Sequence, residues 1–184
     1  SYDMPYSEHI IPYGPVFIHN IDNSTPDDSL ILAESEPEPE PHPDPTYTTF
    51  IDINGTTHSV DIVGSLKRSS FTDQGIAVTD LASVSIGTNV TTIDNNGEMN
   101  WNTNTETGAF EGCTNLISIN FEYESNLSSI ESYAFYGCTS LTTITIPSSV
   151  TSIGLIVFYD CTDLTSVNFE SGIQIKSLGN YARS

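Results

Sequence analysis

The sequence predicts a mainly β protein with short helical turns: a solenoid of about four rungs, an N-terminal β-hairpin cap and an extended N-terminal arm. Three observations lead to this architecture. A leucine followed by alternating apolar residues recurs four times after residue 80. Asn54-Gly55 stands between two alternating segments, which is typical of a hairpin turn. Nine of the ten prolines lie in the first 45 residues of the 184-residue chain, so this region differs in kind from the rest.

The arm divides into two parts. Residues 34–45, "ESEPEPEPHPDP", alternate acids with proline, and this acidic linker is expected to be an extended spacer because proline blocks helix and removes backbone donors. At about 3.1 Å per residue it would reach roughly 37 Å. Residues 1–33 contain the apolar runs "IIPYGPVFIHNI" and "SLILA", which we expect to be docking strands. Two isolated strands are marginal in water, so they need a sheet to join.

Residues 46–80 are predicted to form the hairpin cap. The segment "TYTTFIDINGTTHSVDIVG" at 46–64 alternates polar and apolar residues around Asn54-Gly55. Such a hairpin could cover the first open end of a solenoid, whose apolar cross-section and unpaired edges must be shielded.

Residues 81–184 carry the repeat. Leu81, Leu116, Leu141 and Leu164 open the units "LASVSI", "LISINF", "LTTITI" and "LTSVNF", at spacings of 35, 25 and 23 residues. A period near 23 residues indicates a solenoid, in which each unit buries its apolar face by stacking on its neighbours. A second apolar pair follows each unit: Val90 and Ile93, Leu127 and Ile130, Val150 and Ile153, Ile175 and Leu178.

The three cysteines recur in phase with the repeat. Cys113, Cys138 and Cys161 each follow a phenylalanine by three residues, so we expect them to form a buried column. An odd count cannot form a closed disulfide set, although one bond between adjacent rungs is geometrically possible. Catalytic thiols need a base, and no histidine lies in the repeats.

The combined pattern, AFxxCxxLxxIxIPxxVxxI, resembles the BspA-like leucine-rich repeats of bacterial and protist surface proteins, over about residues 80–182. The resemblance implies a right-handed solenoid with one strand per rung and short turns or helical pieces opposite. It also implies a secreted or surface protein used in adhesion and interaction, and it implies no enzymatic activity.

The solenoid offers few candidate ligand sites. The outward strand positions hold mainly serine, threonine and asparagine, and the flat face they predict has no obvious anchor for a partner. The insert at residues 94–108 holds Trp101, the only tryptophan, and is a possible ligand loop or a simple surface loop. The four histidines, His9, His19, His42 and His58, have no metal spacing, so we expect no metal and no cofactor.

The net charge and the N-glycosylation sequons limit the classes of partner that the chain is expected to have. The formal charge is -20 with four cations, which disfavours nucleic acid and anionic membrane, and no apolar run is long enough for membrane insertion. Glycans on the chain are possible if the protein is exported. The candidate N-glycosylation sites are Asn23, Asn54, Asn89 and Asn126.

These features favour a non-enzymatic extracellular or cell-surface structural protein. Its partners would be copies of itself, joined head to tail into a homo-oligomer or filament by the arm, with glycans or a host surface as further possible partners. Two rivals stay open: a monomeric adhesion or ligand-binding module, and a virion fibre or decoration protein. The predicted subunit-interface residues are Ile10, Ile11, Tyr13, Val16, Phe17, Ile18, Ile21, Leu30, Ile31, Leu32, Leu178 and Tyr181.

Overall fold

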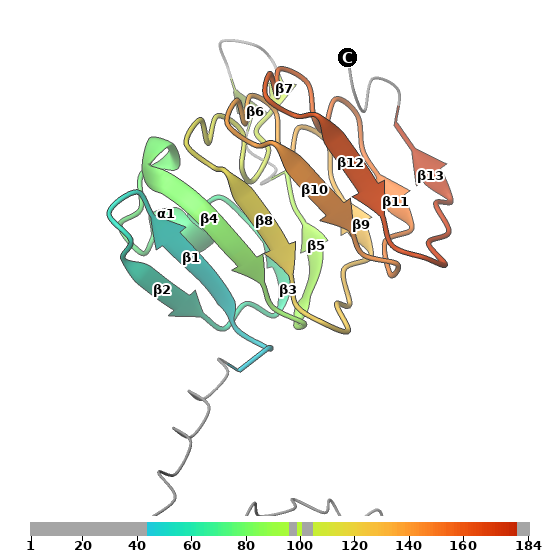
Figure 1. The fold of residues 1–184 in the computed structure, drawn as a ribbon, viewed down its shortest axis with the longest axis horizontal. Helices are drawn as coiled ribbons and strands as arrows, with labels where there is room; N and C mark the ends of the chain where they lie inside the picture. Colours follow the sequence, from blue (N-terminus) through green and yellow to red (C-terminus); the bar gives the residue numbers. More distant parts are fainter. Residues whose placement is uncertain (1–43, 96–98, 101–104, 180–184) are drawn as a thin grey trace, which may run out of the picture. The chain divides into compact units, whose positions relative to one another are not determined.

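The computed structural model describes residues 44–95, 99–100 and 105–179. These residues belong to one compact unit, which is mainly β with almost no helix (Figure 1). Within them the helical elements are α1 (Ser69–Thr72) and the 3₁₀ turn η1 (Val78–Asp80). The predicted docking strands at 1–33 lie outside the described residues, and so do Trp101 and Tyr181.

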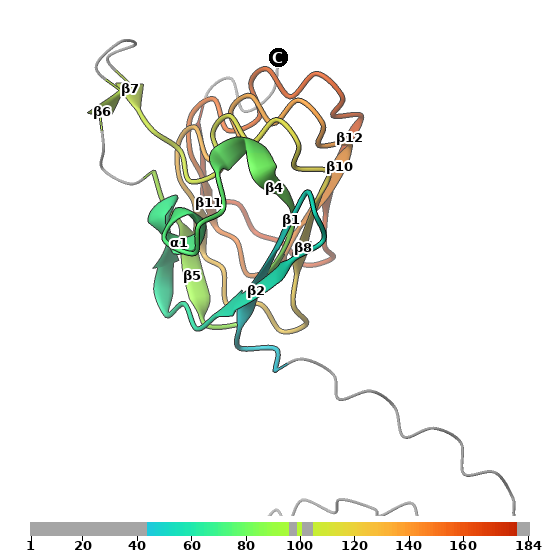
Figure 2. The same cartoon turned by 90° about the vertical axis from the view of Figure 1, so that its left-hand side faces the viewer.

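The strands form two layers, called here the front sheet and the back sheet, and the core lies between them (Figure 2). The front layer comprises the hydrogen-bonded set β2-β1-β4-β8 and the separate pair β10-β12. Its strands are β1 (Thr48–Asp52), β2 (Thr57–Val60), β4 (Leu81–Ile86), β8 (Ser118–Phe121), β10 (Thr143–Ile146) and β12 (Ser166–Phe169). The back sheet, in the order β13-β11-β9-β5-β3, is entirely parallel. Its strands are β3 (Gly64–Leu66), β5 (Val90–Ile93), β9 (Ser129–Ile130), β11 (Ser152–Ile153) and β13 (Ser177–Leu178).

Each rung is a front strand followed by a back strand: β4–β5, β8–β9, β10–β11 and β12–β13. The family resemblance implies one strand per rung, whereas each rung of the structure contains two. The second apolar pair of each unit also forms a strand, because its inward side chains stack in register from rung to rung. The register column on this side consists of Leu66, Ile93, Ile130, Ile153 and Leu178, and all of these except Leu178 belong to the core.

The hairpin indicated by Asn54-Gly55 is present at the N-terminal side. β1 pairs antiparallel with β2, and on its other edge β1 pairs antiparallel with β4. The turn contains Gly55 at a φ of 82°, a conformation that suits glycine. The Asp52 carboxylate accepts hydrogen bonds from the backbone N–H groups of Asn54 (2.8 Å) and Thr56 (2.9 Å), which fixes the loop.

Phenylalanines form the centre of the core. Phe71, Phe110, Phe135 and Phe158 stack nearly parallel along the solenoid, with ring centroids 5.9, 5.4 and 5.5 Å apart. Phe50 of β1 packs against Phe71 at 5.8 Å. Phe71 precedes Leu81, so the phenylalanine column begins before the first leucine of the sequence repeat.

The turns between back and front strands are also stacked. The backbone N–H groups of Gly112 and Gly137 donate to the carbonyl oxygens of Tyr136 (2.8 Å) and Tyr159 (2.9 Å) of the following rung. Both glycines have positive φ, and Asp160 adopts the same conformation at the equivalent position of the third turn. Aspartate tolerates this region better than most residues, so the turn is kept without glycine.

The insert forms a small separate ribbon. β6 (Met99–Asn100) and β7 (Thr105–Glu106) pair antiparallel with each other, and among the described strands neither joins the front or back sheet. The backbone on either side of it is fixed in the solenoid, since Asp94 N–H donates to Leu66 O (2.9 Å) and Ala109 N–H donates to Asp94 O (3.1 Å).

Candidate functional site

The cysteine column is structural. Cys113 and Cys138 are fully buried, Cys161 is nearly so, and all three thiols are free. The Cys138 Sγ donates to Phe110 O at 3.1 Å and the Cys161 Sγ to Phe135 O at 3.0 Å. Burial raises the pKa of Cys113 to about 12 and of Cys161 to about 11, and it raises the pKa of Cys138 well above its usual value. The prediction of a core column is confirmed, because such thiols are neutral and inaccessible at physiological pH.

The described residues hold neither a metal cluster nor a membrane-spanning helix. In the described part of the chain, no group of three or more His, Cys, Asp or Glu side chains is arranged to hold a metal ion. None of its helices has the length and apolar character needed to cross a bilayer. Of the four histidines only His58 is described, and its Nε2 lies 4.0 Å from Asp52 Oδ2 in the hairpin.

The last described rung exposes apolar side chains. Phe169 of β12 is 50% exposed and Leu178 of β13 is 62% exposed, whereas Ile146 and Ile153 of the preceding rung are buried. The repeat pattern predicts an inward Phe169. The structure differs because, within residues 44–179, no further rung packs on β12. Leu178, a predicted interface residue, thus lies at an exposed surface of the described chain.

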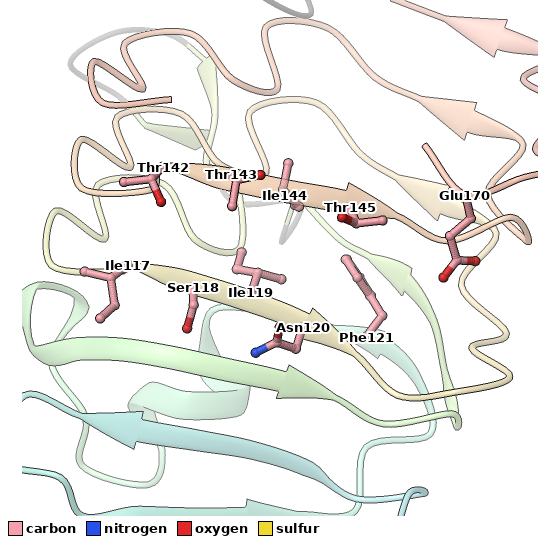
Figure 3. Close-up of a pocket in the computed structure, with 10 residues that line it drawn as sticks. All are labelled: Ile117, Ser118, Ile119, Asn120, Phe121, Thr142, Thr143, Ile144, Thr145 and Glu170. Atoms are coloured by element: carbon pink, nitrogen blue, oxygen red, sulfur yellow. The ribbon is translucent and has the colours of Figure 1, made fainter. Parts of the chain in front are cut away.

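The front face is hollowed between β8 and β10 (Figure 3). One hollow of about 310 Å³ is lined by residues of these two strands and their flanks, among them Ser118, Asn120 and Thr143, and by Glu170. A second hollow of about 420 Å³ adjoins it and shares Phe121 and Glu170. Neither hollow is predicted by the sequence, because the alternation of outward residues indicates a continuous flat sheet.

The sequons lie on turns. Asn54 is exposed in the hairpin loop, and Asn126 is exposed on the turn after β8. The Asn126 side-chain amide donates to Thr88 O of the previous rung at 3.0 Å, and the Asn89 amide lies 3.5 Å from Asp61 Oδ1. Asn23 lies outside the described residues, as do the arm's predicted interface residues. Of the three described sequons, none lies at a common site with Leu178.

The repeat assigns the chain to a family. Residues 80–183 match the profile of the BspA type leucine rich repeat region in six copies. The chain belongs to the BspA-type leucine-rich repeat family. Domains of this family are generally non-enzymatic protein-interaction folds.

Two solved structures of leucine-rich proteins resemble the chain. The pneumococcal vaccine antigen PcpA is 17% identical, with a TM-score of 0.40 over 69% of this chain and 42% of that chain. A leucine rich cell surface protein from Faecalibacterium prausnitzii A2-165 is 18% identical, with a TM-score of 0.39 over 79% of this chain and 52% of that chain. The chain thus spans about half the length of each. No curated protein matches the sequence.

Proposed function

We propose that this BspA-type protein is an extracellular or cell-surface structural subunit whose copies join when the N-terminal arm of one docks on the exposed β12–β13 rung of the next. The exposed apolar surface of β12 and β13 is the observation that carries the proposal. Three apolar side chains there are only partly buried, although their equivalents in the preceding rung belong to the core: Val167, Phe169 and Leu178.

The energetics favour covering this rung. Burying apolar area stabilises by about 25 cal/mol per Å², so a strand that covers Phe169 and Leu178 would gain a few kcal/mol. The outer edges of β12 and β13 also have no strand partner among residues 44–179, and their backbone groups could pair with an added strand.

The arm has the matching chemistry. Its segments at 10–21 and 29–33 are apolar and strand-forming, and the acidic linker at 34–45 would reach roughly 37 Å. An arm that docks on another copy makes a heterologous contact, which can continue into a filament. Asn-linked glycans on Asn23, Asn54, Asn89 or Asn126 and contacts with host glycans belong to the same extracellular proposal.

Mass in solution tests the mechanism. We expect the full chain to form concentration-dependent oligomers in light scattering, and we expect removal of residues 1–33, Phe17→Asp or Leu178→Asp to give monomers. Oligomers that persist after removal of residues 1–33 would exclude the arm as the connector. A full chain that is monomeric at all accessible concentrations would favour the rival, a monomeric adhesion module.

A further inference from the structure

The front sheet is interrupted at one place. β8 is hydrogen-bonded to β4, and β10 is hydrogen-bonded to β12, but β8 and β10 are not paired with each other. The back strands of the same two rungs, β9 and β11, are paired in register. The phenylalanines that precede β8 and β10 also stack closely, with the Phe110 and Phe135 ring centroids 5.4 Å apart. The two rungs are therefore packed together at the core and separated only on the front face.

The sequence supplies a physical reason for the interruption. The residues after β8 and β12 donate their N–H groups to the previous rung: Glu122 to Ile86 O and Glu170 to Ile146 O, each at 3.0 Å. The equivalent residue after β10 is Pro147, which has no N–H to donate. The missing donor removes the hydrogen bond that would join β10 to β8 at this end.

The interruption opens into a groove, defined by the two hollows of about 310 and 420 Å³ that share Phe121 and Glu170. The first hollow presents the side chains of Ser118, Asn120 and Thr143, and Glu170 lies at the same end as Phe121 and Thr145 (Figure 3). The groove thus combines hydrogen-bonding groups with an aromatic ring.

All the charged side chains that line the groove are acidic. Three carboxylates line it, those of Glu122, Glu124 and Glu170, and no lysine or arginine is among the residues that line either hollow. The Glu122 carboxylate is held by Ser85 Oγ at 2.6 Å, and the Glu170 carboxylate accepts from Ser148 N–H at 2.8 Å. Tyr123, 86% exposed, lines the second hollow beside Phe121.

We propose that this front-face groove binds an extended, arginine-bearing segment of a different protein. A guanidinium group matches the site better than an ammonium group, because it pairs with carboxylates through two parallel hydrogen bonds and stacks on aromatic rings such as Phe121 and Tyr123. The hydroxyls and amide of the first hollow would bind the backbone of the segment.

The chain's own arm does not fit this groove. Residues 1–45 hold ten acids and no lysine or arginine, so their charge has the same sign as that of the groove. The groove is therefore a second interaction surface, independent of arm docking.

Peptide binding to the full-length chain tests the proposal. The probe is a fluorescent octapeptide in which arginine alternates with serine, and the control peptides carry citrulline or lysine in place of arginine. We expect affinity in the order arginine, lysine, citrulline, and we expect the peptide to shift backbone amide NMR signals at residues 118–121 and 142–145.

Two matched double variants distinguish peptide binding at the groove from attraction to the overall negative charge of the protein. Glu124→Gln combined with Glu170→Gln should weaken arginine-peptide binding roughly tenfold, because charge-assisted hydrogen bonds are lost. Asp73→Asn combined with Asp163→Asn removes the same charge from exposed positions outside the groove and should leave the affinity unchanged. The amide oxygen that Glu170→Gln introduces can still accept from Ser148 N–H, so folding is expected to persist and is checked by thermal unfolding.

Three outcomes would overturn the proposal: equal weakening by both double variants, equal affinity for the citrulline peptide, or a neutral oligosaccharide that shifts the groove signals when the peptide does not. Removal of residues 1–33 distinguishes this proposal from arm docking. It should abolish assembly and leave peptide binding intact.

Discussion

The two ends of the back sheet contain the same kind of residue in very different surroundings. Leu66 of β3 and Leu178 of β13 belong to one register column, linked through Ile93, Ile130 and Ile153. Leu66 is 0% exposed, and Leu178 is 62% exposed. The N-terminal side of the solenoid carries the hairpin and Phe71, which belong to the same core cluster, whereas the C-terminal side has no equivalent cover within residues 44–179.

The difference shows that the repeat pattern specifies which side chains point inward but does not by itself bury them. In a solenoid each rung is buried by its neighbours, so an identical residue contributes its full hydrophobic stabilisation only where something packs on it. The stability of the domain should therefore fall off from the hairpin side toward β13.

Matched leucine truncations test this gradient most directly. Leu66→Ala should lower the free energy of unfolding by about 2–5 kcal/mol, because it leaves a cavity in a fully buried column. Leu178→Ala should cost less than about 1 kcal/mol, because the side chain is already largely in water. Urea unfolding of a monomeric form, such as the chain without residues 1–33, measures both, and equal losses would mean that β13 is covered.

Cysteine truncations should also cost less stability toward β13, but the difference between positions should be smaller than for the leucines. Cys138→Ala should cost about 1–3 kcal/mol by leaving a small cavity in the middle of the solenoid. Cys161→Ala, nearer the open end and 8% exposed, should cost less. Native thiol labelling provides an independent measurement: we expect Cys161 to react first and Cys113 and Cys138 only on unfolding, and rapid labelling of all three would contradict a buried column.

Alkaline pH should destabilise the fold through these thiols. The pKa is raised from 9.0 to about 12 at Cys113 and to about 11 at Cys161, so above pH 9 the unfolded chain has lost thiol protons that the folded chain keeps. The contribution of these thiols to the free energy of unfolding is fully present below pH 9. It is lost as pH rises toward 11, by up to about 1.4 kcal/mol per pH unit for each such thiol. Urea unfolding between pH 8 and 11 measures the slope, and Cys161→Ala should make it shallower.

Removal of the insert should have the smallest effect. Deleting residues 95–106 leaves three residues between Ile93 and Ala109, the same number that separates Ile130 from Ala134. The ribbon pairs only with itself in the described chain, so the free energy of unfolding should change by no more than about 1 kcal/mol. A larger loss in urea unfolding would show that the insert covers part of the core.

Much of the core was predictable because its signals are local and repeated. The leucine, phenylalanine and cysteine positions recur in phase, and a residue that repeats in a solenoid occupies one column. The second strand of each rung was harder to predict, because Ser129–Ile130 and Ser152–Ile153 are two residues long and become strands only by pairing with neighbouring rungs. Phe71 was missed for a similar reason, since it joins the column from a segment without the repeat's spacing.

The sequence alone determined the inward face, the burial of the three thiols and the family, because each depends on which side chains recur. Only the tertiary structure decided the exposure of Phe169 and Leu178, because burial requires a neighbouring rung that the pattern does not guarantee. It also decided the front-face groove. Pro147 is visible in the sequence, but its effect appears only when β8 and β10 are side by side in space and the hydrogen bond expected after β10 has no donor.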